Sequence, residues 1–111
     1  MSEAIQIPTI SYDAEDEHNK MDYSLILKLH KLLKTSFPLL HRQHPPKVIN
    51  NYSLLYKING TDPSLKPILF CSHLDVVLAP NHDNAWVHDP FQGIIQDNVI
   101  WGRGGKIVCF I

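Results

Sequence analysis

The sequence predicts one α/β domain over residues 1–111, and three patterns carry this prediction: an amphipathic helix, a strand of alternating polarity and a short apolar run. A chain of 111 residues is long enough for one small domain. Its apolar fraction of 44% is ordinary for a globular protein and too high for a disordered one. We therefore expect a folded core of modest size.

The helix is predicted over residues 22–36. Leucines recur there at the spacing of one helix face, and lysines fill positions between them: Leu25, Leu29, Leu32 and Leu33 against Lys28, Lys31 and Lys34. Asp22 is expected to be the N-cap, because its carboxylate can accept a hydrogen bond from a free backbone N–H of the first turn. Pro38 is expected to end the helix, since proline lacks the N–H that a further turn would need.

Two strands are predicted in the middle of the chain. Residues 52–58 alternate between apolar and polar side chains, with one lapse at Leu55. The residues at 68–71 form an unbroken apolar run that is too short for a helix. Such a run is typical of a strand buried on both faces in the middle of an α/β sheet. The residues at 59–64 are expected to make the turn between the two strands.

A hairpin is predicted near the C-terminal end of the sequence. Asp97 and Asn98 lie between short apolar segments at 93–95 and 99–101, and this residue pair is typical of a tight hairpin turn. The preceding stretch, residues 78–92, is polar and rich in proline, so we expect a loop there.

Composition excludes several classes of partner. Ten basic and eleven acidic side chains give a net charge of −1 with no basic cluster, so we expect no binding to nucleic acid or to a membrane surface. No apolar run approaches the ~20 residues of a membrane span, and the first residues do not resemble a signal peptide. Cys71 and Cys109 each lie in an apolar run, which favours buried thiols in a reducing compartment. The expected location is the cytoplasm.

The candidate functional residues follow the predicted buried strand. His73 and Asp75 come directly after the apolar run, and ligands of open α/β sheets bind at the carboxyl ends of strands. A neutral imidazole can coordinate zinc through one ring nitrogen while a carboxylate holds the other. We therefore predict that His73 is a metal ligand and that Asp75 orients it. The competing interpretation is a hydrogen-bonded surface histidine, because a His-x-Asp triplet is common by chance.

Other reactive side chains have weaker claims. Cys71 and Cys109 have apolar neighbours that would raise the pKa of a thiol, so packing is favoured over nucleophilic catalysis. Arg103 lies between two glycines and is either an anion site or part of a structural turn, of which the turn is favoured. His41 and His44 could chelate a metal by chance, but their spacing beside two prolines offers no regular face.

The sequence around His73 resembles a known family. The segment 69–77 is followed in order by Trp86, Asp89-Pro90-Phe91, Gly93-Ile94 and Ile100-Trp101-Gly102-Arg103-Gly104. Upstream, residues 4–11 resemble the opening helix and loop of that family, and residues 59–67 its turn before the metal-bearing strand. The family contains the co-catalytic zinc hydrolases: carboxypeptidase S, the aminoacylases and the N-acyl-amino-acid hydrolases (peptidase family M twenty). The resemblance extends from about residue 4 to residue 104.

The resemblance implies a fold and a reaction. The fold would be a zinc-peptidase-like three-layer α/β/α catalytic domain, of which residues 1–111 are the incomplete N-terminal portion, without the smaller dimerisation domain. The reaction would be hydrolysis of amide bonds in N-acyl amino acids or short peptides. Two zinc ions share a bridging aspartate, and a glutamate acts as general base on metal-held water. His73 matches the histidine of the first metal, and Asp75 matches the carboxylate that orients it.

The match ends after Gly104. Ile107 stands where the family has its bridging aspartate and Val108 where a second aspartate follows, and an alkyl side chain cannot coordinate zinc. We therefore expect at most one weakly bound zinc ion and no activity from this chain alone. Exposed strand edges and apolar surface are also expected.

The alternative is a non-catalytic truncated isoform, or a gene-model fragment, that at most associates with a full-length relative. A lost leader for secretion or for the vacuole remains open beside the cytoplasmic expectation.

Overall fold

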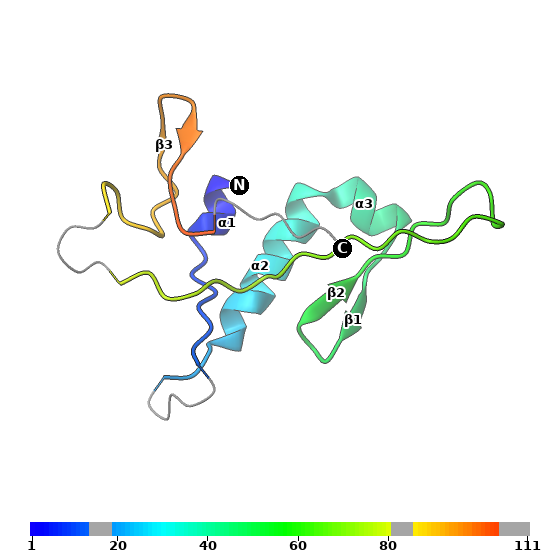
Figure 1. The fold of residues 1–111 in the computed structure, drawn as a ribbon, viewed down its shortest axis with the longest axis horizontal. Coiled ribbons are helices and arrows are strands. Elements are labelled where there is room, and N and C mark those ends of the chain that lie inside the picture. Colours follow the sequence, from blue (N-terminus) through cyan, green and yellow to red (C-terminus); the bar gives the residue numbers. More distant parts are fainter. Residues whose placement is uncertain (14–18, 81–85, 105–111) are drawn as a thin grey trace.

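The computed structural model describes residues 1–13, 19–80 and 86–104 (Figure 1). The elements in chain order are α1 (Ser2–Ile5), α2 (Tyr23–Ser36), α3 (Pro38–Gln43), β1 (Lys47–Ile49), β2 (Ser53–Leu55), β3 (Ile95–Gln96) and β4 (Val99–Ile100). The strands form two separate antiparallel pairs, β1 with β2 and β3 with β4. This mixture of helices and short strands is compatible with part of an α/β domain, whereas the three-layer arrangement stays an implication of the resemblance.

The predicted long helix is confirmed as α2. The carboxylate of Asp22 accepts a hydrogen bond of 2.9 Å from the backbone N–H of Ser24, as expected for an N-cap. Pro38 does follow the end of α2, but the chain resumes a helical course at once. Pro38 is the first residue of α3, because its fixed φ suits the first turn of a helix and its missing N–H is not needed there.

The strand predicted over residues 52–58 is shorter than expected, and its partner was not predicted. β2 pairs with β1 in a register that places Lys47 opposite Leu55. Asn50 and Asn51 connect the strands with φ of 47° and 67°. Two consecutive left-handed residues make a type I′ turn, for which asparagine is well suited. The two asparagines were therefore a local signal for this hairpin.

The hairpin predicted around Asp97 and Asn98 is confirmed as β3 and β4. Both residues have positive φ, 52° and 61°, which again is the geometry of a type I′ turn. The backbone N–H of Trp101 donates to the oxygen of Ile94 at 2.8 Å and extends the ladder beyond the two strands.

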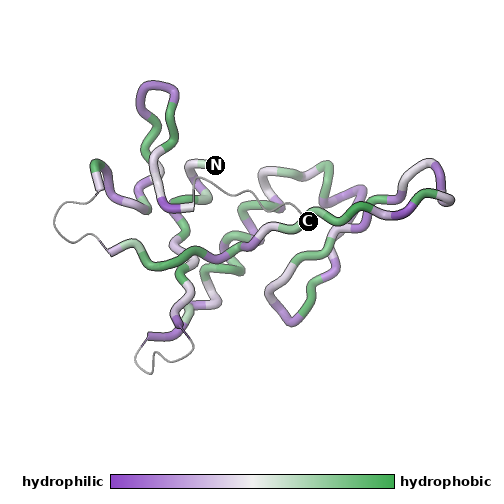
Figure 2. Tube along the Cα trace, in the orientation of Figure 1, coloured by the Kyte–Doolittle hydropathy of each residue, from purple (hydrophilic) through white to green (hydrophobic). Residues whose placement is uncertain are grey.

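The buried strand predicted at 68–71 is wrong. The segment forms no strand, and Ile68 and Phe70 are 79% and 85% exposed. Figure 2 shows this extended part of the chain with hydrophobic colouring along it. Among the described residues, no backbone hydrogen bond joins 66–71 to another segment. An apolar run becomes a buried strand only where neighbouring strands and helices cover it. The expected exposed apolar surface is confirmed at this segment, which is not itself a strand.

The core lies where the N-terminal segment meets α2. Its buried apolar side chains are Ile5, Ile7, Ile26 and Leu29. The predicted leucine stripe of α2 lies near this core, although Ile26 is more buried than any of its members. Cys71 is half-buried, not buried as expected, and Cys109 lies outside the described residues. No helix in the described part of the chain is long and apolar enough to cross a membrane.

Candidate metal site

The N-terminal segment holds the residues after the apolar run in place. The backbone N–H of Val76 donates to the oxygen of Thr9, and the N–H of Ser11 donates to the oxygen of Val76, both at 2.9 Å. These bonds form an isolated parallel bridge between Ile10 and Val76. The buried hydroxyl of Thr9 adds a bond of 2.7 Å to the oxygen of Leu74. The backbone on both sides of Asp75 is therefore fixed.

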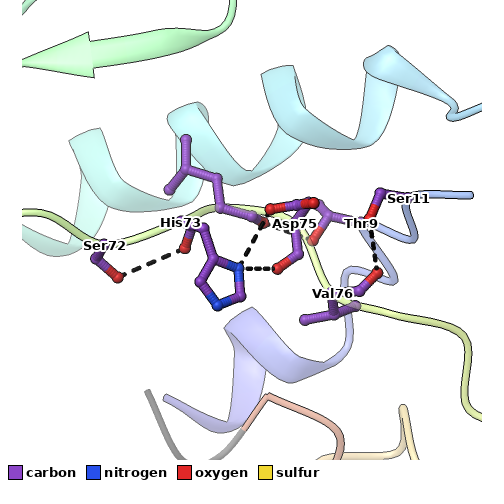
Figure 3. Close-up of polar contacts among 7 residues, drawn as sticks. Thr9, Ser11, Ser72, His73, Asp75 and Val76 are labelled. Atoms are coloured by element: carbon purple, nitrogen blue, oxygen red, sulfur yellow. Dashed lines mark hydrogen bonds and ion pairs between the residues drawn. The ribbon is translucent and has the colours of Figure 1, made fainter. Parts of the chain in front are cut away.

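The two predicted site residues lie in direct contact (Figure 3). Nδ1 of His73 is 2.6 Å from the backbone oxygen of Asp75 and 3.2 Å from its carboxylate Oδ1. Because both neighbours of Nδ1 are acceptors, the proton of a neutral imidazole is assigned to Nδ1. The lone pair is then on Nε2, which points away from Asp75 in Figure 3. This is the tautomer that can coordinate a metal through Nε2.

Both side chains are accessible to solvent, with 54% of His73 and 41% of Asp75 exposed. Where His73 is protonated the contact becomes an ion pair, and exposed ion pairs contribute little to stability. The value of the contact is therefore orientation of the ring more than stabilisation of the fold.

The carboxylate of Asp75 is held in its ionised form. Hydrogen bonding from the Ser11 hydroxyl is the largest cause that lowers the pKa of Asp75, and His73 adds to it, while partial burial opposes the shift. The Ser11 hydroxyl also makes a long contact of 3.5 Å to the backbone oxygen of Val76 (Figure 3). Ser11 is thus a site residue that the sequence analysis missed. Its signal was the Thr9-x-Ser11 spacing, which places both hydroxyls on one side of an extended segment.

The described residues do not fit a complete zinc site. They contain no group of three or more histidine, cysteine, aspartate or glutamate side chains placed to hold a metal ion. A catalytic zinc ion needs three protein ligands, of which His73 is one candidate. Ile107 and Val108 lie outside the described residues. The described residues alone therefore do not provide a site for metal-dependent hydrolysis.

Other histidines are engaged in contacts that link elements. Nε2 of His30 is 2.9 Å from the backbone oxygen of Tyr52. His41 lies between the backbone oxygen of Phe37, at 3.0 Å, and the hydroxyl of Tyr56, at 2.9 Å. The bonds to Tyr52 and Tyr56 join α2 and α3 to the β1–β2 hairpin and to the residue that follows it, which accounts for both histidines without a metal.

The Gly102-Arg103-Gly104 segment makes a turn that lies against Ile5, Val76 and Pro90. The backbone N–H of Arg103 donates to the oxygen of Pro90 at 2.7 Å. A Cβ at Gly102 would overlap the side chain of Ile5, and Gly104 has a φ of +81°. Both glycines are therefore needed for the turn, in agreement with the favoured interpretation of this motif.

A small cavity of about 90 Å³ connects these features. Its wall includes His73 and Asp75 from the candidate site, Arg103 from the turn, and apolar side chains such as Ile5 and Phe91. The cavity brings together residues that are up to about a hundred positions apart in the sequence.

Comparison with known proteins finds relatives named as carboxypeptidases or as N-fatty-acyl-amino acid synthase/hydrolases. The chain is 46% identical over 102 residues to "Probable carboxypeptidase S-like 1" of Dictyostelium discoideum, a match that covers 92% of this chain and 20% of that protein. It is 39% identical over 101 residues to the N-fatty-acyl-amino acid synthase/hydrolase of Homo sapiens, covering 91% and 19%. Carboxypeptidase S of Saccharomyces cerevisiae is 34% identical over 113 residues, covering 96% and 19%. The chain spans about one fifth of the length of the curated relatives it matches.

Two further comparisons gave no match. No family model matches the chain, and no solved structure matches it significantly.

Proposed function

This chain belongs to the family of the carboxypeptidase S-like proteins and the N-fatty-acyl-amino acid synthase/hydrolases, and we propose from this that it is part of a metal-dependent amide hydrolase. The proposed substrates are N-acyl amino acids or short peptides, in keeping with the names of these relatives. The proposed metal is zinc. When bound, zinc would polarise the amide carbonyl and activate a water molecule.

In this proposal His73 is a zinc ligand through Nε2. The observation that carries the proposal is the contact of Nδ1 with two oxygens of Asp75, because it fixes both the tautomer and the ring orientation. Ser11 would act one step further out, since its hydroxyl lowers the pKa of Asp75 and so favours the ionised carboxylate. The remaining ligands and the general base would come from residues outside the described part of the chain.

A second candidate function is non-catalytic association with a longer relative. The wrongly predicted strand supports it, because Ile68 and Phe70 expose apolar side chains next to a backbone without partners among the described residues. In this case the chain would bind but not hydrolyse.

The role of His73 is tested by zinc titration of the full 111-residue chain, followed through the imidazole proton resonances. We expect zinc to shift the resonances of His73 before those of the other histidines, with weak affinity because one ligand binds alone. In the His73→Ala variant, the shift of histidine resonances at the lowest zinc concentrations should disappear. His44→Ala is the matched control and should leave it unchanged. A first event at another histidine would refute the assignment.

The two candidate functions are separated by the native protein. An antibody against residues 47–67 would isolate the protein from its source for measurement of intact mass and of N-acyl-amino-acid hydrolysis. A mass well above the 12.7 kDa of this chain, together with chelator-sensitive hydrolysis, supports the hydrolase. A mass equal to that of the chain, with a longer relative recovered beside it and no hydrolysis by the chain itself, supports the binding function.

A further inference from the structure

The sequence contains two Asn-x-Ser/Thr triplets whose middle residue is not proline, Asn51-Tyr52-Ser53 and Asn59-Gly60-Thr61. This pattern is the acceptor of N-linked glycosylation, in which a sugar is joined to the side-chain nitrogen of the asparagine. The triplet is short and also arises by chance. Because the modifying enzyme must bind the triplet at the protein surface, the structure of the two segments distinguishes them.

The triplet at Asn59 lies in a fully exposed loop. Every residue from 57 to 70 is exposed, and the loop projects from the body of the molecule at the right of Figure 1. A Cβ at Gly60 would meet no atom within 4 Å, so the middle of the triplet faces open space. No hydrogen bond joins Asn59, Gly60 or Thr61 to any other residue that the structure describes. The amide of Asn59 and the hydroxyl of Thr61 are therefore free to contact an enzyme.

The turn that follows this triplet is held by its own residues. The backbone N–H and the hydroxyl of Ser64 both donate to the carboxylate of Asp62, at 2.9 Å and 2.7 Å. This local bonding is typical of aspartate in a turn. It orders the chain after Thr61 without engaging the triplet itself.

The triplet at Asn51 is part of a folded hairpin instead. Asn51 has a φ of 67° in the turn between β1 and β2, and Ser53 is the first residue of β2. The backbone oxygen of Tyr52 is 2.9 Å from Nε2 of His30, and its ring stacks on Tyr23 with 4.3 Å between the ring centres. An enzyme that binds this triplet would have to break these contacts, so Asn51 is the poorer acceptor of the two.

We propose that Asn59 is the acceptor of an N-linked oligosaccharide. The co-reactant is a glycosyl diphosphate carried on a lipid. The side-chain nitrogen of Asn59 forms a bond to C1 of the sugar, while the bond from C1 to the diphosphate oxygen breaks and its electrons leave with that oxygen. The amide nitrogen gives up one proton to solvent. The hydroxyl of Thr61 supplies the recognition contact that defines the triplet.

This modification has two consequences for the chain. N-linked glycosylation belongs to surface loops of secreted proteins, so the proposal favours the secretory alternative over the expected cytoplasmic location. A bulky hydrophilic glycan would also shield apolar side chains of its own loop, where Ile58 and Leu65 are 64% and 71% exposed. Asn59 does not line the cavity with His73, so the inference does not rest on the proposed hydrolase function.

The first test uses the native protein. A glycan on Asn59 would lie within residues 47–67, so the protein is isolated with an antibody against residues 86–104 instead. Peptide N-glycanase converts a glycosylated asparagine to aspartate, and mass spectrometry of tryptic peptides then locates the change. Cleavage after Lys57 places the two triplets in different peptides. We expect aspartate at position 59 and asparagine at position 51.

Variants give the second arm. The full chain is fused to a secretion signal and expressed in eukaryotic cells, where a glycan slows its migration in gel electrophoresis until the glycanase removes it. Asn59→Gln and Thr61→Ala should lose this shift, whereas Thr61→Ser should keep it because serine also completes the triplet. Asn51→Gln is the matched control and should keep the shift. The side chains of Asn59 and Thr61 make no contact in the described structure that the first two variants would remove.

Two outcomes would overturn the proposal. One is native protein whose Asn59 is unmodified, whatever the fused chain shows. The other is a glycan shift that survives in Asn59→Gln, since the acceptor would then be another residue. Neither result involves zinc or hydrolysis, so the assignment of His73 can fail or stand separately.

Discussion

The imidazole Nδ1 of His73 lies 2.6 Å from the backbone oxygen of Asp75 and 3.2 Å from its carboxylate, so two oxygens of a single residue contact one ring nitrogen. The two acceptors differ in what a mutation can remove. The backbone oxygen remains in any variant, whereas the carboxylate supplies the negative charge that raises the basicity of the imidazole.

Replacing Asp75 by asparagine should therefore weaken zinc binding at His73 without abolishing it. Loss of an orienting carboxylate typically lowers metal affinity about 10- to 100-fold, and the surviving bond to the backbone oxygen favours the lower end. The measurement is the zinc titration of the histidine resonances in Asp75→Asn. Asp89→Asn is the control, because Asp89 bonds to the backbone N–H of Phe91 and not to a histidine. Equal affinities in the two variants would show that the carboxylate plays no part.

The helical signal should depend on pH through the N-cap of α2. The hydrogen bond from Ser24 lowers the pKa of Asp22 below its ordinary value of 3.8. A lowered folded-state pKa means that the cap stabilises the helix above the unfolded pKa and is lost as the pH falls through the folded pKa. Circular dichroism at 222 nm should therefore weaken below about pH 4 in the unchanged chain.

Two variants isolate this effect. Asp22→Ala should show reduced helicity at neutral pH and lose the acid step that belongs to the cap. Asp62 makes the same local bond to Ser64 in a turn outside any helix, and its pKa is also lowered. Asp62→Ala should therefore leave the acid step in place. An identical step in all three proteins would assign it to other carboxylates.

Gly102→Ala should destabilise the chain. The added methyl group would overlap the Ile5 side chain and approach the backbone oxygen of Pro90 to 3.1 Å, and overpacking of this kind costs about 1–3 kcal/mol. Gly60→Ala is the matched control, because a methyl group there meets nothing within 4 Å. Urea unfolding followed by tryptophan fluorescence should show a lower midpoint for Gly102→Ala alone. Equal midpoints for both variants would mean that the turn adjusts freely.

Phe70→Lys should reduce self-association of the purified chain. Phe70 is 85% exposed in an extended apolar segment whose backbone has no partner among the described residues, which favours edge-to-edge aggregation. Leu27→Lys, at a residue of α2 that is 52% exposed, adds the same charge on a helix and serves as the control. The increase of light scattering with time should be slower for Phe70→Lys and unchanged for Leu27→Lys. Similar slowing in both would indicate that net charge alone controls solubility.

Prediction from sequence succeeded where the signal is local. Asp22 caps α2 through a bond that spans two residues, and the Asp97–Asn98 turn depends on the φ angles of the turn residues themselves. Asn50 and Asn51 also tolerate positive φ, but this signal was not used to predict the β1–β2 hairpin. The contact of His73 with Asp75 also spans two residues, which is why both could be named as partners, although the metal role of His73 stays a prediction.

What could not be predicted depends on distant segments. The run at 68–71 has the composition of a central strand, but a strand is stabilised by its neighbours, and these are missing among the described residues. The contribution of Ser11 to Asp75 arises from a parallel bridge between residues 10 and 76.

The sequence by itself determined the capped helix, the turn at Asp97, the family and the pairing of His73 with Asp75, because short-range geometry and ordered motifs specify these. Only the tertiary structure decided that residues 9–11 fix the backbone at 74–76 and that Arg103 shares a cavity with His73. The physical reason is that hydrogen bonds and cavities between residues far apart in the chain exist only once packing has brought their backbones together.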